Sequence, residues 1–227
     1  MTRIKICGLR RPQDIEAVNR AGPDFAGFVV EVPGSRRSVS REELRSLAGG
    51  LKKEILAVGV FVNAPPELVA ELLEEGTIQL AQLHGQEDEA YLRRLRKWTD
   101  KPLIQAFSIR TEADARRALL STADYLLFDQ GSGGTGRSFD WSLLPEISRP
   151  FFLAGGLGED NLAEAIRQVR PWAVDLSSSL ETDGLKDPEK IRRAVELVRG
   201  SREETKRRRK CQKEDLEYTE ASTFRRR

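Results

Sequence analysis

Short apolar segments alternate with longer amphipathic segments along residues 1–200. Each apolar segment has four to six residues and is rich in Val, Ile, Leu and Phe, which is typical of strands buried in a parallel sheet. Successive segments start 22 to 31 residues apart, so each connection has room for a crossover helix. The pattern predicts eight strands: Arg3 to Cys7, Phe25 to Val30, Leu56 to Phe61, Gln79 to Leu83, Leu103 to Phe107, Tyr125 to Phe128, Phe151 to Ala154 and Ala173 to Leu176.

The segments between these strands have helical periodicity, and several begin with Pro, Asp, Ser or Thr, as helix N-termini do. Eight strand–helix units with right-handed crossovers close most simply into a single (β/α)8 TIM barrel, an α/β fold. A doubly wound open sheet is the alternative, but no strand is followed by a glycine-rich dinucleotide fingerprint. Predicted helices include Pro12 to Arg20, Pro66 to Glu75, Asp88 to Lys97, Glu112 to Leu120 and Glu159 to Val169.

The length of 227 residues and the apolar content of 39% fit one barrel domain, which we place at residues 1–200. No apolar segment approaches the ~20 residues that cross a bilayer, and the first residues lack an apolar signal region. We therefore expect a cytoplasmic protein without membrane contacts. Cys7 and Cys211 lack the spacing of metal ligands, so no metal site is predicted.

Residues 201–227 differ from the rest of the chain. They carry 10 Lys/Arg and 6 Asp/Glu and have no apolar periodicity. Such a composition buries too little apolar surface to fold by itself, so we expect a charged, disordered or loosely helical C-terminal extension. The basic run from Lys206 to Lys210 is of a type that attracts nucleic acid, but the acidic residues around it favour a solvated tail.

In a closed barrel the C-terminal ends of the strands form one face, and the loops on that face carry function. Glycine and reactive side chains follow five of the predicted strands, so we expect an active site there. The residues are Cys7-Gly8, His84-Gly85, Asp129 with the glycine-rich loop 131–136, Gly155-Gly156 and Ser177-Ser178-Ser179.

The segments after the last two strands predict a phosphate site. Gly155 and Gly156 let backbone N–H groups approach an anion, and Ser177 and Ser178, just after Asp175, add hydroxyl donors. Either segment alone would be typical of an ordinary turn. Their joint position indicates phosphate binding, because (β/α)8 barrels often bind phosphate after these two strands.

Cys7 and Asp129 are a candidate base and acid at the barrel mouth. A thiol has an ordinary pKa of about 8.5, which positive surroundings lower toward the thiolate that abstracts protons. An aspartate must instead be held protonated to donate a proton. Singly, Cys7 is typical of a small buried hydrophobe and Asp129 of a solvated carboxylate. The loop 131–136, which includes Gly134, is compatible with a lid, a set of backbone donors or a plain connection, and we favour a functional loop because Asp129 begins it.

Six motifs in order along residues 1–199 resemble the phosphoribosylanthranilate isomerases of tryptophan biosynthesis. The motifs are Lys5-Ile6-Cys7-Gly8-Leu9, Gly59-Val60-Phe61-Val62-Asn63, Gln82-Leu83-His84-Gly85, Phe128-Asp129 with Gly133 to Gly136 and Phe139-Asp140-Trp141, Ala154-Gly155-Gly156-Leu157, and Val174-Asp175-Leu176-Ser177-Ser178. The resemblance implies an Amadori rearrangement of N-(5-phosphoribosyl)anthranilate without metal or organic cofactor. It implies that Asp129 opens the furanose ring as general acid and that Cys7 removes the C2 proton as general base.

The resemblance also implies the substrate contacts. The loop 33–40 is similar to the family's Ser-Pro-Arg-Tyr-Val-Ser segment, which assigns the anthranilate carboxylate to Arg37; a shift of one residue would assign it to Arg36, and a solvated basic loop is the other interpretation. The implied partner is a small phosphorylated substrate, bound by a monomer or a homodimer. The phosphate and sugar would contact Gly134, Gly155, Gly156, Asp175, Ser177 and Ser178.

The chain departs from the family pattern at Ser38, Gln130 and Ser179. These departures affect the predicted ligand contacts more than the predicted acid–base chemistry. His84, the single histidine, is interpreted as a structural or substrate-proximal residue at a strand end. Two other functions compete. An isomerase of the related aminoimidazole substrate would use paired carboxylates, which Cys7 argues against. A phosphate-binding or RNA-associated protein would leave Cys7 with Asp129 unexplained.

Overall fold

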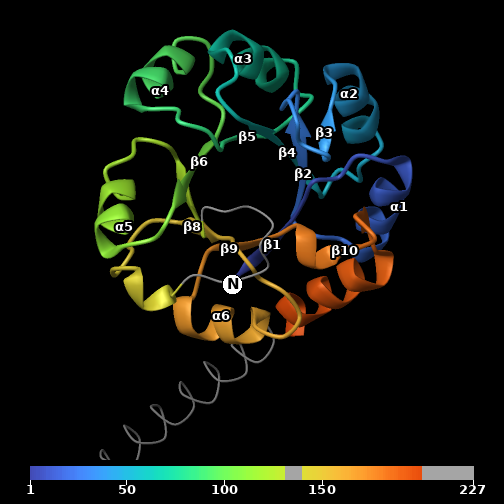
Figure 1. The fold of residues 1–227 in the computed structure, drawn as a ribbon. Coiled ribbons are helices and arrows are strands. Elements are labelled where there is room, and N and C mark those ends of the chain that lie inside the picture. Colours follow the sequence, from blue (N-terminus) through green and yellow to red (C-terminus); the bar gives the residue numbers. More distant parts are fainter. Residues whose placement is uncertain (131–139, 201–227) are drawn as a thin grey trace, which may run out of the picture.

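The computed structural model describes residues 1–130 and 140–200, which form a closed barrel of parallel strands surrounded by helices (Figure 1). The barrel strands are β1 (Arg3–Cys7), β2 (Phe25–Val30), β4 (Leu56–Phe61), β5 (Leu80–Leu83), β6 (Leu103–Ser108), β7 (Tyr125–Asp129), β8 (Phe151–Leu153) and β9 (Ala173–Leu176). Their order around the barrel is β1-β9-β8-β7-β6-β5-β4-β2, and the pairing of β1 with β2 closes it. The short strand β3 (Ser38–Val39) pairs in parallel with the C-terminal end of β2.

Seven helices in the described residues cover the outside of the barrel. They are α1 (Pro12–Ala21), α2 (Arg41–Gly49), α3 (Pro66–Glu74), α4 (Glu89–Leu95), α5 (Glu112–Ala118), α6 (Leu162–Val169) and the helical segment 188–200. The described part of the connection from β7 to β8 contains the 3₁₀ turn η1 (Trp141–Leu143) instead. The predicted (β/α)8 barrel is confirmed.

All eight predicted strands are present, each within one residue of its predicted bounds. The largest error concerns the helix expected at Glu159 to Val169, which begins at Leu162. The reason is a turn that the Asn161 side chain closes. Its Oδ1 accepts from the Gly158 N–H and its Nδ2 donates to the Gly156 carbonyl, both at 2.9 Å. An asparagine side chain that bonds nearby backbone favours such a turn over continued helix.

The inside of the barrel has an aromatic layer and a polar layer. At the N-terminal end of the barrel, the rings of Phe25, Tyr125, Phe152 and Trp172 pack with centroids 4.6 to 5.8 Å apart. Side chains alternate along a strand and registered neighbours share a face, so the next inward positions toward the C-terminal end can be read from the pairing. They hold Lys5, Cys7, Gln82, Asp129 and Asp175.

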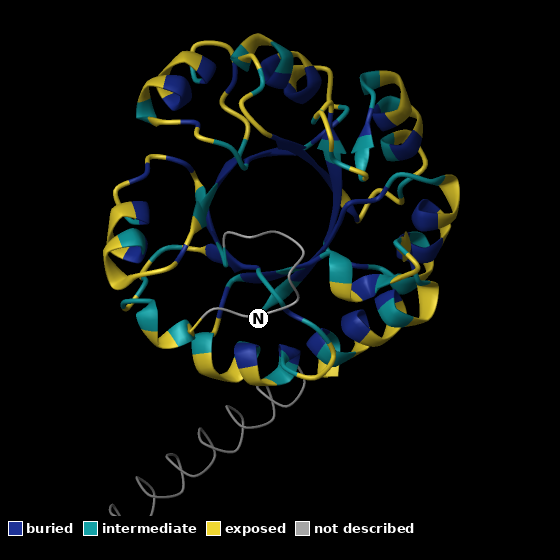
Figure 2. Cartoon of the chain, in the orientation of Figure 1, coloured by how far each residue is buried: buried dark blue, intermediate teal, exposed yellow. Residues whose placement is uncertain are grey.

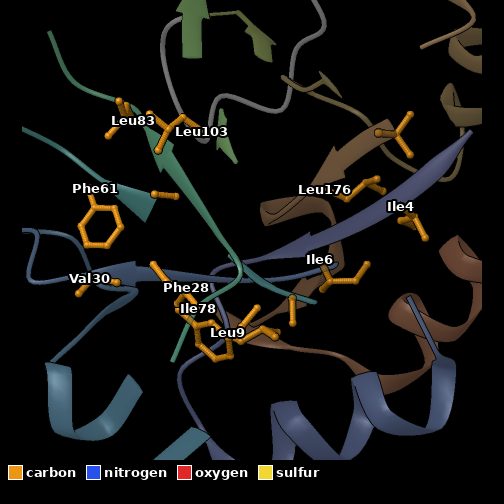
Figure 3. Close-up of a cluster of buried hydrophobic side chains, with 14 of the residues drawn as sticks. Ile4, Ile6, Leu9, Phe28, Val30, Phe61, Ile78, Leu83, Leu103 and Leu176 are labelled. Carbon is orange, nitrogen blue, oxygen red and sulfur yellow. The ribbon is translucent and has the colours of Figure 1, made fainter. Parts of the chain in front are cut away.

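The larger core lies between the outer face of the barrel and the helices. It includes Ile4, Ile6, Phe28, Phe61 and Leu176, all at most 1% exposed (Figure 3). Each helix turns its buried side to this layer and its exposed side to solvent, while the ring of strands is buried throughout much of its length (Figure 2). This apolar sleeve holds the strands in place, so that their C-terminal ends present side chains in a fixed geometry.

A small hairpin of β10 (Glu181–Thr182) and β11 (Leu185–Lys186) follows β9. Asp183 and Gly184 form its turn, both with positive φ (51° and 75°), as a tight two-residue hairpin turn requires. The register places Glu181 opposite Lys186. Among the described helices, none combines the length and the apolar character needed to span a membrane.

Candidate active site

Strand β1 presents Lys5 and Cys7 to the barrel interior, because side chains two residues apart share one face of a strand. Cys7 lies beside Gly27 of β2 in the strand register. A Cβ atom at Gly27 would lie 2.9 Å from Lys5 Nζ and 3.0 Å from Cys7 Sγ. The glycine therefore provides the space in which the ammonium and the thiol lie together.

Lys5 forms an ion pair with Asp175 of the neighbouring strand β9. Its Nζ donates to both carboxylate oxygens, at 3.0 and 2.9 Å, and the Lys5 side chain is fully buried. Burial alone would lower the pKa of Lys5, but Asp175 and Cys7 outweigh it and raise this pKa above its ordinary value. A permanent positive charge is thus held next to Cys7.

The Cys7 thiol is a buried group whose charge state depends on these neighbours. It is 8% exposed, and burial raises the pKa of the thiol above its ordinary value, while Lys5 and Lys186 oppose that rise. Asp175 adds to it through its negative charge. A thiolate in this position therefore depends on the two lysines for its stability.

The Asp129 carboxylate is positioned at the end of β7 by its surroundings. Its Oδ1 accepts from the Gln130 N–H at 2.6 Å, and its Oδ2 lies 3.5 Å from His84 Nε2. The other ring nitrogen of His84 lies 2.7 Å from Gln82 Nε2. A Cβ atom at Gly155 would lie 2.8 Å from Asp129 Oδ1, so this glycine is needed for the close approach. The contact between His84 and Asp129 is not evident from the sequence.

The loops after β8 and β9 lie side by side, as the predicted phosphate site requires. Gly155 and Gly156 have φ values of 82° and 63°, which L side chains rarely adopt. A Cβ atom at Gly158 would lie 3.4 Å from Ser179 Cβ, so the two loops are in contact. The two predicted phosphate-binding segments are therefore neighbours in the structure.

The serines after β9 have separate positions. Ser177 Oγ donates to the Cys7 carbonyl at 3.1 Å, which ties β9 to β1 next to the thiol. Ser178 begins the 3₁₀ turn η2 (Ser178–Leu180). The predicted contact residue Gly134 lies outside the described residues, together with the rest of the loop 131–136.

Arg37, the residue assigned to the substrate carboxylate, reaches over the end of β1. Its Cδ would lie 2.5 Å from a Cβ atom at Gly8, directly after Cys7. The Arg37 side chain is 19% exposed and that of Arg36 is 61% exposed, so Arg37 is the more buried of the two arginines. Its guanidinium is held by Glu181, with Nε and Nη2 at 2.7 and 3.0 Å from the carboxylate oxygens.

The structure thus brings Cys7, Asp175, Ser177 and Arg37 together around β1 and places Asp129 with Gly155 on the same barrel face. Sequence reasoning missed three neighbours of this group. Lys5 carried a signal, because a lysine two residues before Cys7 in an apolar strand must share its face. Glu181 and Lys186 carried none, since a charged pair in a loop region is typical of solvated surface. Cys7 and Asp129 come from β1 and β7, which are three places apart around the barrel.

The fold and this face define a (β/α)8-barrel enzyme with a thiol and a carboxylate at its mouth. The model of the family "N-(5'phosphoribosyl)anthranilate (PRA) isomerase" matches residues 4–197. An N-(5'-phosphoribosyl)anthranilate isomerase of Endomicrobium trichonymphae is 44% identical over 203 residues, covering 88% of this chain and 99% of its own. The chain therefore belongs to the N-(5'-phosphoribosyl)anthranilate isomerase family, whose members are isomerases of tryptophan biosynthesis.

Solved structures of this family have the same fold. A phosphoribosyl anthranilate isomerase in complex with reduced 1-(o-carboxyphenylamino)-1-deoxyribulose 5-phosphate is 32% identical, with a TM-score of 0.75 over 88% of this chain and 100% of its own. A monomeric form of the dimeric isomerase of Thermotoga maritima is 33% identical, with a TM-score of 0.76 over 88% of this chain and 100% of its own. Each of these two matches spans the whole length of the relative.

Proposed function

We propose that this chain converts N-(5-phosphoribosyl)anthranilate into 1-(2-carboxyphenylamino)-1-deoxyribulose 5-phosphate, with Asp129 as general acid and Cys7 as general base. The observation that carries the proposal is the convergence of these two groups on one barrel face, with the Lys5–Asp175 pair beside the thiol. The complexed relative binds a reduced form of this product, which supports the substrate class.

The first step opens the sugar ring. Protonated Asp129 donates its proton to the furanose oxygen, the C1–O bond breaks, and the anthranilate nitrogen forms a Schiff base with C1. His84, 3.5 Å from Asp129 Oδ2, and the Gln130 N–H keep the carboxyl group in a fixed orientation for this transfer.

The second step removes the C2 proton. The thiolate of Cys7 accepts it, and the electron pair of the C–H bond moves into the iminium to give an enolamine, which tautomerises to the ketone. The iminium makes C2 acidic, so the proposal requires neither metal nor organic cofactor. The Lys5 ammonium, held by Asp175, stabilises the thiolate that burial disfavours.

Binding determinants lie on both sides of these groups. The substrate phosphate binds at the contacting loops after β8 and β9, with Gly155, Gly156, Ser177 and Ser178, while Asp175 faces the sugar. Arg37 binds the anthranilate carboxylate, because a guanidinium suits two parallel hydrogen bonds to a carboxylate. The enzyme acts as a monomer or a homodimer in the cytoplasm, without nucleic-acid or membrane partners.

Turnover of freshly generated phosphoribosylanthranilate, followed by the loss of its fluorescence, tests the proposal. Cys7→Ser and Asp129→Asn should each reduce kcat by roughly 10²- to 10⁴-fold, the usual contribution of a general acid or base. Asp100→Asn makes the same change in an exposed loop residue that precedes β6 and should leave kcat unchanged. A folded wild-type protein without turnover would refute the activity, and turnover that survives either substitution would refute that residue's role.

A further inference from the structure

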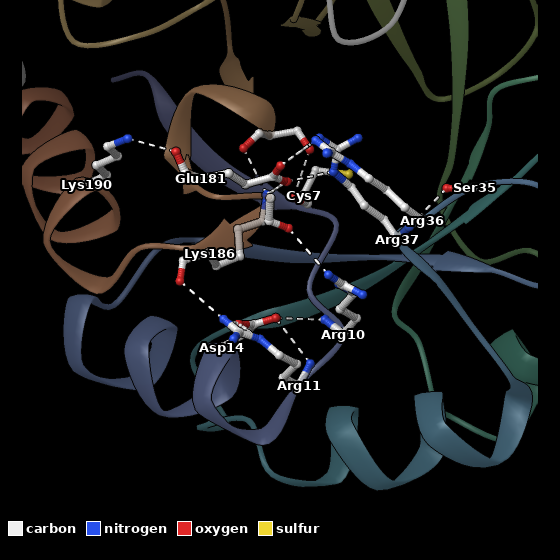
Figure 4. A network of polar contacts seen from close by, with 12 residues as sticks. Cys7, Arg10, Arg11, Asp14, Ser35, Arg36, Arg37, Glu181, Lys186 and Lys190 are labelled. Atoms are coloured by element: carbon white, nitrogen blue, oxygen red, sulfur yellow. Dashed lines mark hydrogen bonds and ion pairs between the residues drawn. The ribbon is translucent and has the colours of Figure 1, made fainter.

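Glu181 is the centre of a cluster of cations at the barrel mouth (Figure 4). Its Oε1 accepts from Arg37 Nε at 2.7 Å and from Lys186 Nζ at 3.0 Å. Its Oε2 accepts from Arg37 Nη2 at 3.0 Å and from Arg36 Nη2 at 2.8 Å. The Glu181 side chain is only 6% exposed. Four hydrogen bonds from three charged side chains to one buried carboxylate exceed what holding together this short hairpin requires.

The ion pair between Arg37 and Glu181 uses only one edge of the Arg37 guanidinium. Within residues 1–130 and 140–200, this guanidinium bonds through Nε and Nη2, both to Glu181. A guanidinium presents a second bidentate edge, formed by Nη1 and the other proton of Nη2. A substrate carboxylate can bind that edge while Glu181 retains the first, so the two carboxylates need not compete.

Lys186 connects the cluster to the thiol. Its Nζ donates to the Ser177 carbonyl at 2.8 Å as well as to Glu181, and Ser177 in turn donates to the Cys7 carbonyl. The Lys186 side chain is 2% exposed. Burial lowers the pKa of Lys186 and Glu181 opposes this change, so the glutamate supports the positive charge of a lysine that stabilises the Cys7 thiolate.

We propose that Glu181 is a positioning residue that orients the Arg37 guanidinium for an aromatic ortho-carboxylate and holds Lys186 beside Cys7. The inference deepens the proposed function, because it names the residue that prepares the carboxylate site of that same reaction. Pre-orientation has an energetic basis: an arginine already fixed by a buried partner loses less side-chain freedom when it binds the ligand.

Binding of the reduced product analogue, reduced 1-(o-carboxyphenylamino)-1-deoxyribulose 5-phosphate, tests this role without turnover. Glu181→Gln should weaken the affinity roughly 10-fold, because the guanidinium loses its fixed orientation. Thr182→Val is the matched control on the same hairpin. It removes the 2.8 Å hydrogen bond from Thr182 Oγ1 to Asp187, touches neither arginine, and should leave the affinity unchanged.

A double-substitution cycle with Arg37→Met separates positioning from hairpin stability. If Glu181 acts through Arg37, Glu181→Gln should cost little further affinity once Arg37 is replaced, so the two effects are non-additive. In turnover assays Glu181→Gln should raise KM by a similar factor of roughly 10, with a smaller loss in kcat that reflects Lys186. Glu181→Asp keeps the charge but is one methylene shorter, and it should lie between the wild type and Glu181→Gln; it also serves if Glu181→Gln folds poorly.

Analogue affinity that is unchanged in folded Glu181→Gln and Glu181→Asp would overturn the inference and leave Glu181 as a hairpin residue. Tighter binding would also overturn it, because Glu181 would then be a competitor for Arg37. A wild-type protein that binds the analogue but does not turn over the substrate would refute the proposed function and leave this binding test intact.

Discussion

The Lys5 ammonium and the Asp175 carboxylate form an ion pair inside the barrel, 170 positions apart in the sequence and 2.9 Å apart in space. Lys5 lies on β1 and Asp175 on the neighbouring strand β9, and the pair lies next to the Cys7 thiol. Two charges taken out of water are costly, so the presence of this pair beside the proposed base Cys7 indicates a role in the electrostatics around the thiol. Lys5 therefore affects both the stability of the fold, through Asp175, and the pKa of the Cys7 thiol.

Replacing Lys5 should lower the free energy of unfolding, because Asp175 loses its partner. Lys5→Met leaves Asp175 as a buried carboxylate without its cation, which typically destabilises a protein by about 3 to 5 kcal/mol. Lys5→Met combined with Asp175→Asn removes both charges and should recover much of that loss. Urea unfolding measures both. Equal destabilisation in the single and double variants would show that the charge pairing is not the cause.

The rate of Cys7 alkylation by iodoacetamide should rise with pH and continue to rise above pH 9. Burial raises the pKa of the thiol above its ordinary value, and the reactive thiolate is the form that exists above this pKa. The same sign holds for the contribution of Cys7 to kcat/KM, because a general base must be deprotonated, whereas the general acid Asp129 must stay protonated. Peptide mapping after timed alkylation separates Cys7 from Cys211, which serves as an internal control.

Lys5→Met should move the alkylation profile of Cys7 to still higher pH, because the ammonium lowers the pKa of this thiol. Cys211 should keep its profile in the variant. A plateau of the wild-type profile below pH 8, or a downward shift in Lys5→Met, would contradict the electrostatic account.

Gly155→Ala should reduce kcat more than it reduces stability. The new Cβ would lie 2.8 Å from Asp129 Oδ1 and 2.7 Å from the backbone nitrogen of Gln130, so the proposed acid must move. Displacements near 1 Å can cost about 10²-fold in rate. Gly76→Ala is the control, because Gly76 lies in an exposed turn after α3, has a similar φ of 76° and has no atom within 4 Å of its added Cβ. It should cost about 1 to 2 kcal/mol through backbone strain alone. Steady-state kinetics and thermal unfolding of both variants test the prediction. A kcat of Gly155→Ala similar to that of the control variant would show that Asp129 tolerates the contact.

A chain that ends at Gly200 should retain full activity. The helical segment 188–200 buries Ile191, Val195 and Val198, so the packed barrel extends to this point. A chain that ends at Asp187 lacks these three side chains and should fail to fold. Activity and circular dichroism of both truncations test the prediction, and loss of turnover in the longer one would show that residues 201–227 contribute to the site.

Local sequence predicted the barrel strands and the strand ends at which several candidate site residues lie. Parallel strands buried on both faces must be continuous apolar segments, so all eight were found within one residue of their bounds. Residues that follow a strand end lie on a known face of a barrel, which located Cys7, Asp129 and Gly155 from their positions alone. The helix starts were less certain, because a side-chain turn such as that of Asn161 competes with helix over a few residues.

Tertiary structure decided which partner each of these residues has. Strand alternation shows that Lys5 shares a face with Cys7, but the registered pairing of β1 with β9 is what brings Asp175 to the lysine. Likewise, the loop after β2 and the hairpin after β9 meet only in the closed barrel, which brings Arg37 to Glu181 across 144 positions. A continuous apolar pattern specifies which segments form buried strands, whereas an ion pair depends on positions fixed to within about an ångström. The sequence by itself therefore determined the fold and the barrel face that carries the candidate residues. The tertiary structure determined which charged side chains surround the Cys7 thiol.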